Sequence, residues 1–230
     1  MKKALLLAAV LTLAAAPAFA FFDDFNSYAN GNLYGQGTWN KGNSTSWIQV
    51  ENGMVKIVGG DTGSGDRTVG TEAVAGLTGT IYIEFDILAG ENLNTSWSVL
   101  ADDDGTPDGN LARAYGTAGT VRGRIDGYGI VTGQDPLAPG WNHVQIVIDT
   151  AANTDTFYLN GTPLSGTNPI SHAGYAGDVL QRVSFHKVNP GQTVYLDNLW
   201  VANRPVPEPA SLVALMTGLA GVVGYARRRR

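Results

Sequence analysis

The sequence predicts an all-β protein, an antiparallel two-sheet β-sandwich, and three observations lead to this fold class. Apolar residues recur with a period of two wherever their pattern is clear, and no stretch of the middle of the chain sustains a helical period. Glycine accounts for 30 of 230 residues, or about 13% against a typical ~7%. Gly, Pro, Asn and Asp separate ten or more short segments, which favours a jelly roll.

The two clearest strands are predicted at residues 80–88 and 141–149, where apolar and polar side chains alternate. Further strands are predicted at residues 54–58, 68–74, 97–101, 111–115, 119–125, 156–159, 182–187 and 192–202. The pair Asn160-Gly161 is the strongest signal for a tight turn between strands. We therefore expect one β-sandwich domain over residues 21–204.

Charge and cysteine content exclude several classes of function. Residues 21–205 hold nine basic and 19 acidic side chains, a net charge of −10, so the domain repels phosphate backbones and nucleic acid is not an expected partner. The chain has no cysteine, which excludes a disulfide framework, thiol catalysis and cysteine-ligated zinc.

The first 20 residues predict a secretory signal peptide. Lys2 and Lys3 precede an apolar run over residues 4–16, and Ala18-Phe19-Ala20 has the small-x-small pattern of a cleavage site. We expect signal peptidase to cleave after Ala20 during export.

The last 26 residues predict a single transmembrane helix. Prolines 207 and 209 prevent a helix before residue 210. Residues 210–226 would then span about 26 Å as a helix, slightly less than the ~30 Å hydrocarbon core. Positive flanks stay in the cytoplasm, so the domain is expected outside the inner membrane. The predicted cytoplasmic anchor is Arg227, Arg228, Arg229 and Arg230.

The order of Pro207-Glu208-Pro209, apolar span and terminal arginines over residues 205–230 resembles the PEP-CTERM sorting signal. The resemblance implies recognition of Pro207, Glu208 and Pro209 by an exosortase, a membrane enzyme of Gram-negative bacteria that make exopolysaccharide. It also implies removal of the span and delivery to the cell surface or the extracellular biofilm matrix. Such a tail is an address and does not determine the activity of its cargo.

A second resemblance concerns the domain. The segments Pro139-Gly140-Trp141-Asn142-His143-Val144 and Tyr158-Leu159-Asn160-Gly161 resemble a strand pair of laminin-G-like and concanavalin-like sandwiches. Asp23-Asp24-Phe25 and Tyr195-Leu196-Asp197-Asn198-Leu199 resemble the first and last strands of the same group, which includes many carbohydrate-binding modules. The resemblance implies a jelly roll and suggests extracellular polysaccharide as a ligand.

Two groups of aspartates are candidate calcium ligands, since Ca²⁺ takes six to eight oxygen ligands. In jelly rolls of the group above, a structural calcium ion often joins the first and last strands, which here would use Asp23, Asp24 and Asp197. Alternatively, Asp197 caps a turn or pairs with a cation. The second group has the i, i+2, i+6 spacing of an acidic calcium loop but lacks the bidentate glutamate, and a solvated hairpin loop is the favoured alternative. This group is Asp102, Asp104 and Asp108.

Glu84 and Asp86 are the candidates for catalysis, because a Glu-x-Asp-x-Glu series serves some concanavalin-like glycoside hydrolases. The third position is Leu88, so the partner that the retaining mechanism requires is missing. No nucleophile-elbow motif occurs, and the three histidines lack metal-like spacing. We expect a protein without enzymatic activity, with a glycan hydrolase or lyase as the alternative.

Aromatic side chains in polar stretches are candidate platforms for sugar rings. Trp141 and Trp200 lie in predicted strands and are expected in the core. The sequence thus predicts an exported, sorted, polysaccharide-associated binding module, with a purely structural surface protein as a further alternative. The candidate sugar contacts are Trp39, Trp47, Trp97, Tyr115 and Tyr128.

Overall fold

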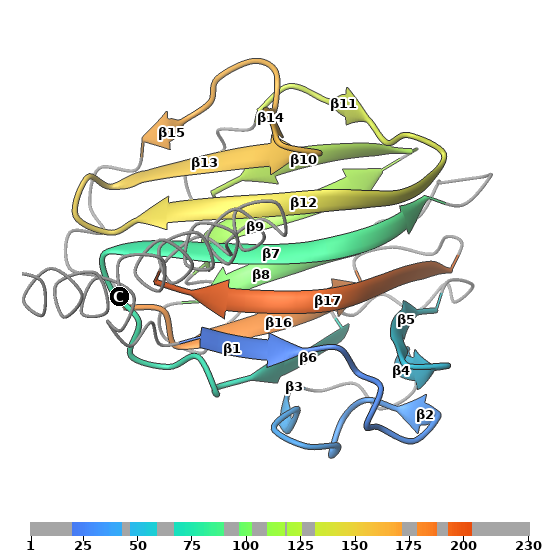
Figure 1. The fold of residues 1–230 in the computed structure, drawn as a ribbon. Coiled ribbons are helices and arrows are strands. Elements are labelled where there is room, and N and C mark those ends of the chain that lie inside the picture. Colours follow the sequence, from blue (N-terminus) through green and yellow to red (C-terminus); the bar gives the residue numbers. More distant parts are fainter. Residues whose placement is uncertain are drawn as a thin grey trace, which may run out of the picture.

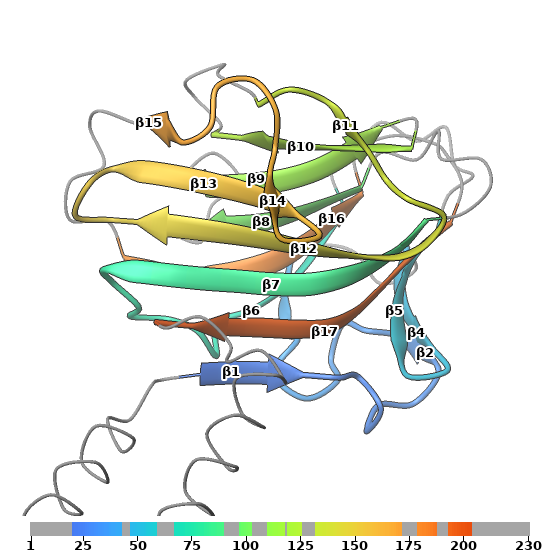
Figure 2. The same cartoon turned by 45° about the horizontal axis from the view of Figure 1, so that its top comes forward.

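The structure, a computed structural model, consists of β-strands and connecting turns in the part of the chain that it describes (Figure 1). That part comprises residues 20–42, 47–58, 67–89, 97–102, 110–117, 119–125, 132–171, 179–187 and 193–203. Two antiparallel sheets pack face to face, which confirms the predicted fold class (Figure 2).

The larger sheet has ten strands. They are β1 (Ala20–Asp23), β2 (Gly31–Asn32), β4 (Ile48–Glu51), β5 (Met54–Ile57), β7 (Thr80–Ala89), β12 (Gly140–Asp149), β13 (Thr154–Leu159), β14 (Thr162–Pro163), β15 (Ile170–Ser171) and β17 (Val194–Ala202). The order is β14-β13-β12-β7-β17-β5-β4-β2, with β1 paired to β17 and β15 paired to β13. The long strands β12, β7 and β17 therefore lie side by side at its centre (Figure 1).

The smaller sheet has seven strands in the order β11-β10-β9-β8-β16-β6-β3. They are β3 (Lys41–Gly42), β6 (Arg67–Thr71), β8 (Trp97–Asp102), β9 (Asn110–Thr117), β10 (Thr120–Arg124), β11 (Asp135–Pro136) and β16 (Arg182–Lys187). Every strand pair in both sheets is antiparallel.

The core fills the space between the sheets, and its aromatic rings bridge them. Phe85 of β7 meets Trp97 of β8 edge to face, with ring centroids 6.0 Å apart. Trp39 stacks on Phe185 of β16 at 4.9 Å. Because alternate residues of β7 and β12 point into this core, the intervening polar residues of both strands point outward.

The two ends of the described domain lie next to each other, since Ala20 of β1 is opposite Ala202 of β17. Residues 1–19 of the predicted signal peptide and all of residues 205–230 lie outside the described residues. Within the described ranges, no helix has the length and apolar character needed to cross a membrane. The predicted helix over residues 210–226 stays a prediction.

Candidate functional site

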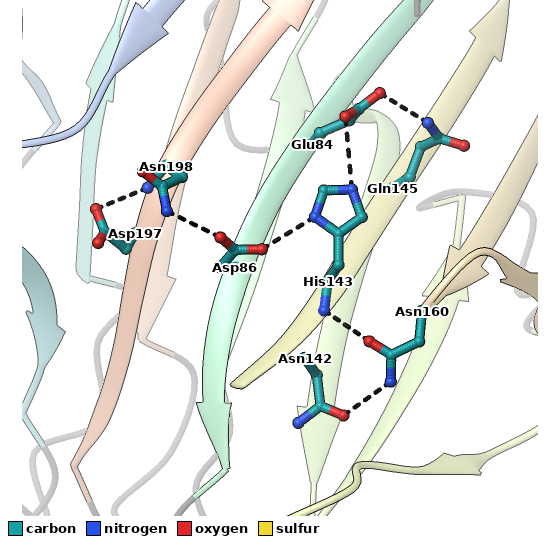
Figure 3. A network of polar contacts seen from close by, with 8 residues as sticks. All are labelled: Glu84, Asp86, Asn142, His143, Gln145, Asn160, Asp197 and Asn198. Atoms are coloured by element: carbon teal, nitrogen blue, oxygen red, sulfur yellow. Dashed lines mark hydrogen bonds and ion pairs between the residues drawn. The ribbon is translucent and has the colours of Figure 1, made fainter. Parts of the chain in front are cut away.

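Polar side chains converge on the outward face of the ten-stranded sheet, where β12, β7 and β17 run side by side (Figure 3). The register places His143 opposite Asp86 and Gln145 opposite Glu84. It also places Asp86 opposite Asp197. Three strands far apart in the sequence thus bring these residues together. We call Glu84, Asp86, His143, Gln145 and Asn198 the His143 cluster.

The imidazole of His143 lies between the two carboxylates of β7. Its Nδ1 is 3.0 Å from Asp86 Oδ1, and its Nε2 is 3.5 Å from Glu84 Oε2. Gln145 Nε2 donates to Glu84 Oε1 at 2.7 Å, and Asn198 Nδ2 donates to Asp86 Oδ2 at 2.9 Å. Asn198 has a φ of 52° at an irregularity in β17, and this local bend directs its amide toward β7.

The carboxylates make His143 a cation at neutral pH. The pKa of His143 is raised to about 9, mainly by its hydrogen bond to Asp86 and, to a smaller extent, by its hydrogen bond to Glu84. Burial acts to raise the pKa of Asp86, but the hydrogen bonds from His143 and Asn198 outweigh it and lower that pKa. The pKa of Asp197 is raised, chiefly by burial. The backbone hydrogen bond from Asn198 acts to lower this pKa, and the negative charges of neighbouring carboxylates act to raise it further.

The two carboxylates of the His143 cluster can be compared with the carboxyl pair of a retaining glycosidase. In such enzymes one carboxyl group has a raised pKa and protonates the leaving group, while the other attacks as a nucleophile. Here one imidazolium contacts both carboxylates, and the pKa of Asp86 is lowered. The cluster is arranged as an ion-paired network whose remaining polar atoms can donate and accept hydrogen bonds.

The turn after β13 fixes the position of His143. The backbone N–H of His143 donates to Asn160 Oδ1 at 2.8 Å, and Asn160 Nδ2 donates to Asn142 Oδ1 at 3.1 Å. Asn160 and Gly161 have φ values of 51° and 77°, which confirms the predicted tight turn. Asn142 is buried and also bonds to the backbone of Ala138, so the turn is anchored on both sides.

Aromatic and apolar side chains lie on both sides of the His143 cluster. On one side, Trp141 is opposite Leu88, which is in turn opposite Tyr195. On the other, Trp200 is opposite Glu84, and its ring lies 5.4 Å from that of Phe22. Trp141 is 47% exposed and Phe22 is 51% exposed, so apolar ring surface borders the polar network.

The structure corrects part of the predicted aromatic set. Trp39 and Trp97 are 0% and 1% exposed, so their rings pack in the core and cannot stack on a sugar. Trp47 and Tyr115 are half-buried, and Tyr128 lies outside the described residues. The expectation that Trp141 and Trp200 lie in the core is wrong for both. Trp200 lies opposite Glu84 on the outward face, where its ring contacts the exposed Phe22, and Trp141 is itself 47% exposed. Its strand parity, shared with His143 and Gln145, already indicates an outward side chain.

Asp23 accepts hydrogen bonds on both carboxylate oxygens. Its Oδ1 accepts from the Phe25 amide at 2.9 Å, and its Oδ2 accepts from the Tyr28 hydroxyl and Trp39 Nε1, both at 2.7 Å. Asp23 is buried, so these bonds tie the end of β1 to the core. Asp23 therefore already has a structural role.

The other proposed calcium ligands lie in different surroundings. Asp24 accepts from the Asn26 amide, and Asp197 accepts from the Asn198 amide. Asp102 belongs to the seven-stranded sheet, where it is buried and paired with Arg182 at 2.8 Å, and Asp104 and Asp108 lie outside the described residues. No group of three or more His, Asp or Glu in the described ranges is placed to hold a metal ion.

Comparison with known proteins identifies the C-terminal segment and supports the fold. Residues 205–230 match the model of the PEP-CTERM protein-sorting motif. This motif indicates an exported protein that an exosortase processes at the membrane. None of the curated proteins compared with the chain matches it.

Solved structures share the fold at low sequence identity. The cellulose-induced protein Cip1 is 17% identical at a TM-score of 0.55, with 81% of this chain and 98% of that chain covered. A Bacillus subtilis protein of unknown function with a galectin-like fold is 12% identical at a TM-score of 0.52, covering 82% and 96%. A sialidase is 16% identical at a TM-score of 0.59 over 79% of this chain, which spans only 18% of the sialidase. These similarities establish a jelly-roll fold.

Proposed function

We propose that this exported protein is a non-catalytic polysaccharide-binding module and that the glycan lies across β12, β7 and β17 on the outward face of the ten-stranded sheet. The observation that carries the proposal is the His143 cluster bordered by exposed rings, above all Trp141. A glycan-related role also agrees with the jelly-roll fold and with the sorting motif.

The spacing suits a sugar chain. A pyranose ring has apolar C–H faces that pack on aromatic rings, and hydroxyl groups that need hydrogen-bond partners. Trp141, His143 and Gln145 alternate along β12 on one face, so successive side chains are about 7 Å apart. A sugar stacked on Trp141 would therefore place its hydroxyls, or those of the next residue, near His143 and Asp86.

The ion pairs favour binding over hydrolysis. Hydrogen bonds to Asp86 and Glu84 keep the His143 imidazole protonated at neutral pH. Each carboxylate also accepts from a second donor, Glu84 from Gln145 and Asp86 from Asn198. Such a preorganised network can bind hydroxyls without large rearrangement. Because its pKa is lowered, Asp86 is not poised to protonate a leaving group.

Replacement of Trp141 by alanine tests the site. We expect at least a tenfold loss of affinity for a binding polysaccharide, measured by affinity electrophoresis against a panel of neutral and acidic glycans. Tyr34→Ala is the matched control, because Tyr34 is also exposed but lies outside the cluster. Equal affinity of W141A and the parent protein would refute this site, and absence of binding to every glycan would favour a purely structural protein.

Glu84→Gln separates binding from catalysis. The proposal predicts no release of reducing ends or unsaturated products from any glycan that the parent protein binds. Turnover by the parent protein that E84Q lacks would establish the hydrolase or lyase alternative, in which Glu84 and Asp86 are catalytic.

Sorting is tested in a host that contains an exosortase. Replacing Pro207, Glu208 and Pro209 by alanines should leave the full-length chain in the inner membrane, because the recognition element is lost. Normal maturation of this variant would contradict recognition through these residues.

A further inference from the structure

We propose that the glycan site continues from Trp141 across the ten-stranded sheet as a row of four side chains, and that this row binds an extended, uncharged glycan with about one sugar over each strand. The inference rests on the proposed function, because both share Trp141. It adds the class of glycan, the direction of its chain and further binding residues. We call Trp141, Leu88, Tyr195 and Lys56 the Trp141 row.

The backbone register places these four residues in line. Trp141 of β12 is opposite Leu88 of β7. Leu88 is in turn opposite Tyr195 of β17, and Tyr195 is opposite Lys56 of β5. The strands follow one another in this order in the sheet, with β5 beside the start of β17 (Figure 1). The row therefore runs across the strands rather than along them.

All four side chains lie on the outward face of the sheet. Their neighbours along each strand are buried, and side chains alternate between the two faces of a strand. Trp141 is the most exposed of the four, and Leu88, Tyr195 and Lys56 are half-buried. A ligand can therefore contact the whole row. The buried neighbours are Ile87, Asn142, Val194, Leu196, Val55 and Ile57.

The spacing of the row fits a sugar chain. Neighbouring strands are ~4.8 Å apart, so Trp141 and Tyr195, with β7 between them, lie about 10 Å apart at the backbone. An extended chain such as that of cellulose repeats its ring about once per strand spacing. Alternate rings of such a chain face the same way and can pack on the two aromatic side chains. The sugar between them then lies over the apolar side chain of Leu88.

Charged neighbours hold Tyr195 in place before a ligand binds. Its hydroxyl donates to Glu51 Oε2 at 2.5 Å, and Lys56 Nζ donates to Glu51 Oε1 at 2.7 Å. The Lys56 ammonium also lies 5.9 Å from the centroid of the Tyr195 ring. A side chain that is already fixed loses little entropy when a sugar packs on it. The ammonium group has three N–H donors, so it can also bond to a hydroxyl of the fourth sugar.

The charges on this face disfavour an acidic glycan. Strands β4, β5, β7, β12 and β17 carry five carboxylates, and the cations on these strands are Lys56 and the protonated His143. Both cations already pair with carboxylates of the same face. A uronate or sulfate group would be repelled within the Debye length of ~8 Å, or would have to displace one of these carboxylates. A neutral chain avoids both costs. The carboxylates are Glu51, Glu84, Asp86, Asp149 and Asp197.

Titration calorimetry of the purified full chain tests the row. The probes are the di- to hexasaccharides of cellulose, mannan and xylan, with oligogalacturonates of the same lengths as the acidic comparison. We expect at least one neutral series to bind, with an affinity that rises about tenfold from the disaccharide to the tetrasaccharide and little beyond it. The affinity should stay within about twofold between about 50 and about 500 mM salt, because a neutral chain makes no ion pairs that salt could screen. Tighter binding of oligogalacturonates than of every neutral series would overturn the proposal.

Tyr195→Ala isolates the third position of the row. In this variant the tetrasaccharide should bind no more tightly than the disaccharide. Tyr195→Phe keeps the ring and should retain most of the gain with chain length. Tyr82→Ala is the matched control, because Tyr82 is also a half-buried tyrosine on the outward face but lies near the other end of β7 from Leu88. The same length dependence in Y195A and the parent protein would contradict the row.

Two further variants separate this inference from the proposed function. If Y195A does not fold, Lys56→Ala removes the fourth position, and its affinity for the tetrasaccharide should fall to that for the trisaccharide. W141A should lose affinity for every chain length. Binding that depends on Trp141 but on neither Tyr195 nor Lys56 would overturn the row and leave the proposed function standing. Failure of every neutral series to bind, while another polysaccharide binds through Trp141, would have the same meaning. Binding that W141A leaves unchanged would overturn both.

Discussion

Replacing His143 by glutamine should destabilise the protein at acidic and neutral pH but not at pH 10. The pKa of His143 rises from an ordinary 6.5 to about 9 in the folded protein. At 1.36 kcal/mol per pKa unit this shift corresponds to a ceiling of roughly 3.4 kcal/mol. The side chain is 45% exposed, so solvent screening reduces the contribution, and we expect about 1 kcal/mol.

The sign follows from the direction of the shift. A raised folded-state pKa means that the native state binds the proton more tightly than the unfolded chain does. The stabilisation is complete below pH 6.5 and disappears as the pH rises through about 9.

Urea unfolding at pH 6, 8 and 10 measures the effect. The difference in unfolding free energy between parent and variant should fall from about 1 kcal/mol at pH 6 to near zero at pH 10. Lys41→Gln serves as a control, because it removes the exposed ion pair of Lys41 with Glu72 and leaves the His143 cluster, which lies on the other sheet, unchanged. A difference that is the same at pH 6 and pH 10, or an NMR titration of His143 with a pKa at or below 6.5, would refute the reasoning.

Three further predictions concern stability. Asp23→Ala should lower the unfolding free energy by about 3 kcal/mol in urea, because Tyr28 and the buried Trp39 indole lose their charged acceptor; a loss below about 1 kcal/mol would contradict this. Trp97→Ala should cost about 3 to 5 kcal/mol, whereas Trp141→Ala should cost less than about 0.5, and similar costs would contradict the assigned burial. The calcium site expected from the sequence predicts a higher melting temperature in calcium than in chelator, and a smaller difference in Asp197→Asn. Bound calcium would relieve the repulsion between carboxylates that, after burial, helps to raise the pKa of Asp197. Identical melting temperatures would rule out this site.

Alternation of apolar and polar residues was sufficient to predict the long central strands. The segments predicted at residues 80–88 and 141–149 correspond to β7 and β12, and the one at residues 182–187 corresponds to β16. The predicted strand over residues 68–74 ends early, at Thr71, because the Ala75 amide bonds to the Glu72 carbonyl and starts a turn.

Short strands were harder to predict. β4 (Ile48–Glu51) was missed, although its burial alternates, because four residues give too few positions to establish a period. Its partner is β5, which follows directly after the turn Asn52-Gly53, with φ values of 54° and 75°. This Asn-Gly pair is the local signal that could have predicted the hairpin.

The candidate site was only partly predictable. Alternation assigned Glu84, Asp86, His143 and Gln145 to outward faces, but it could not tell which outward residues of different strands are neighbours. That information lies in the register, which pairs β7 with β12 and β17. The raised pKa of His143 and the ion pairs with two carboxylates follow from this register alone.

The same reasoning explains why net charge was an incomplete guide to ligands. The −10 charge of residues 21–205 is a sum over both sheets, but at 0.15 M salt the Debye length is about 8 Å. Register places Arg113, Arg122 and Arg124 at outward positions of the seven-stranded sheet, whereas Glu84, Asp86 and Asp197 lie on the outward face of the ten-stranded sheet. Register separates the charges, so one acidic chain can present an arginine cluster on one face and a carboxylate–imidazolium network on the other.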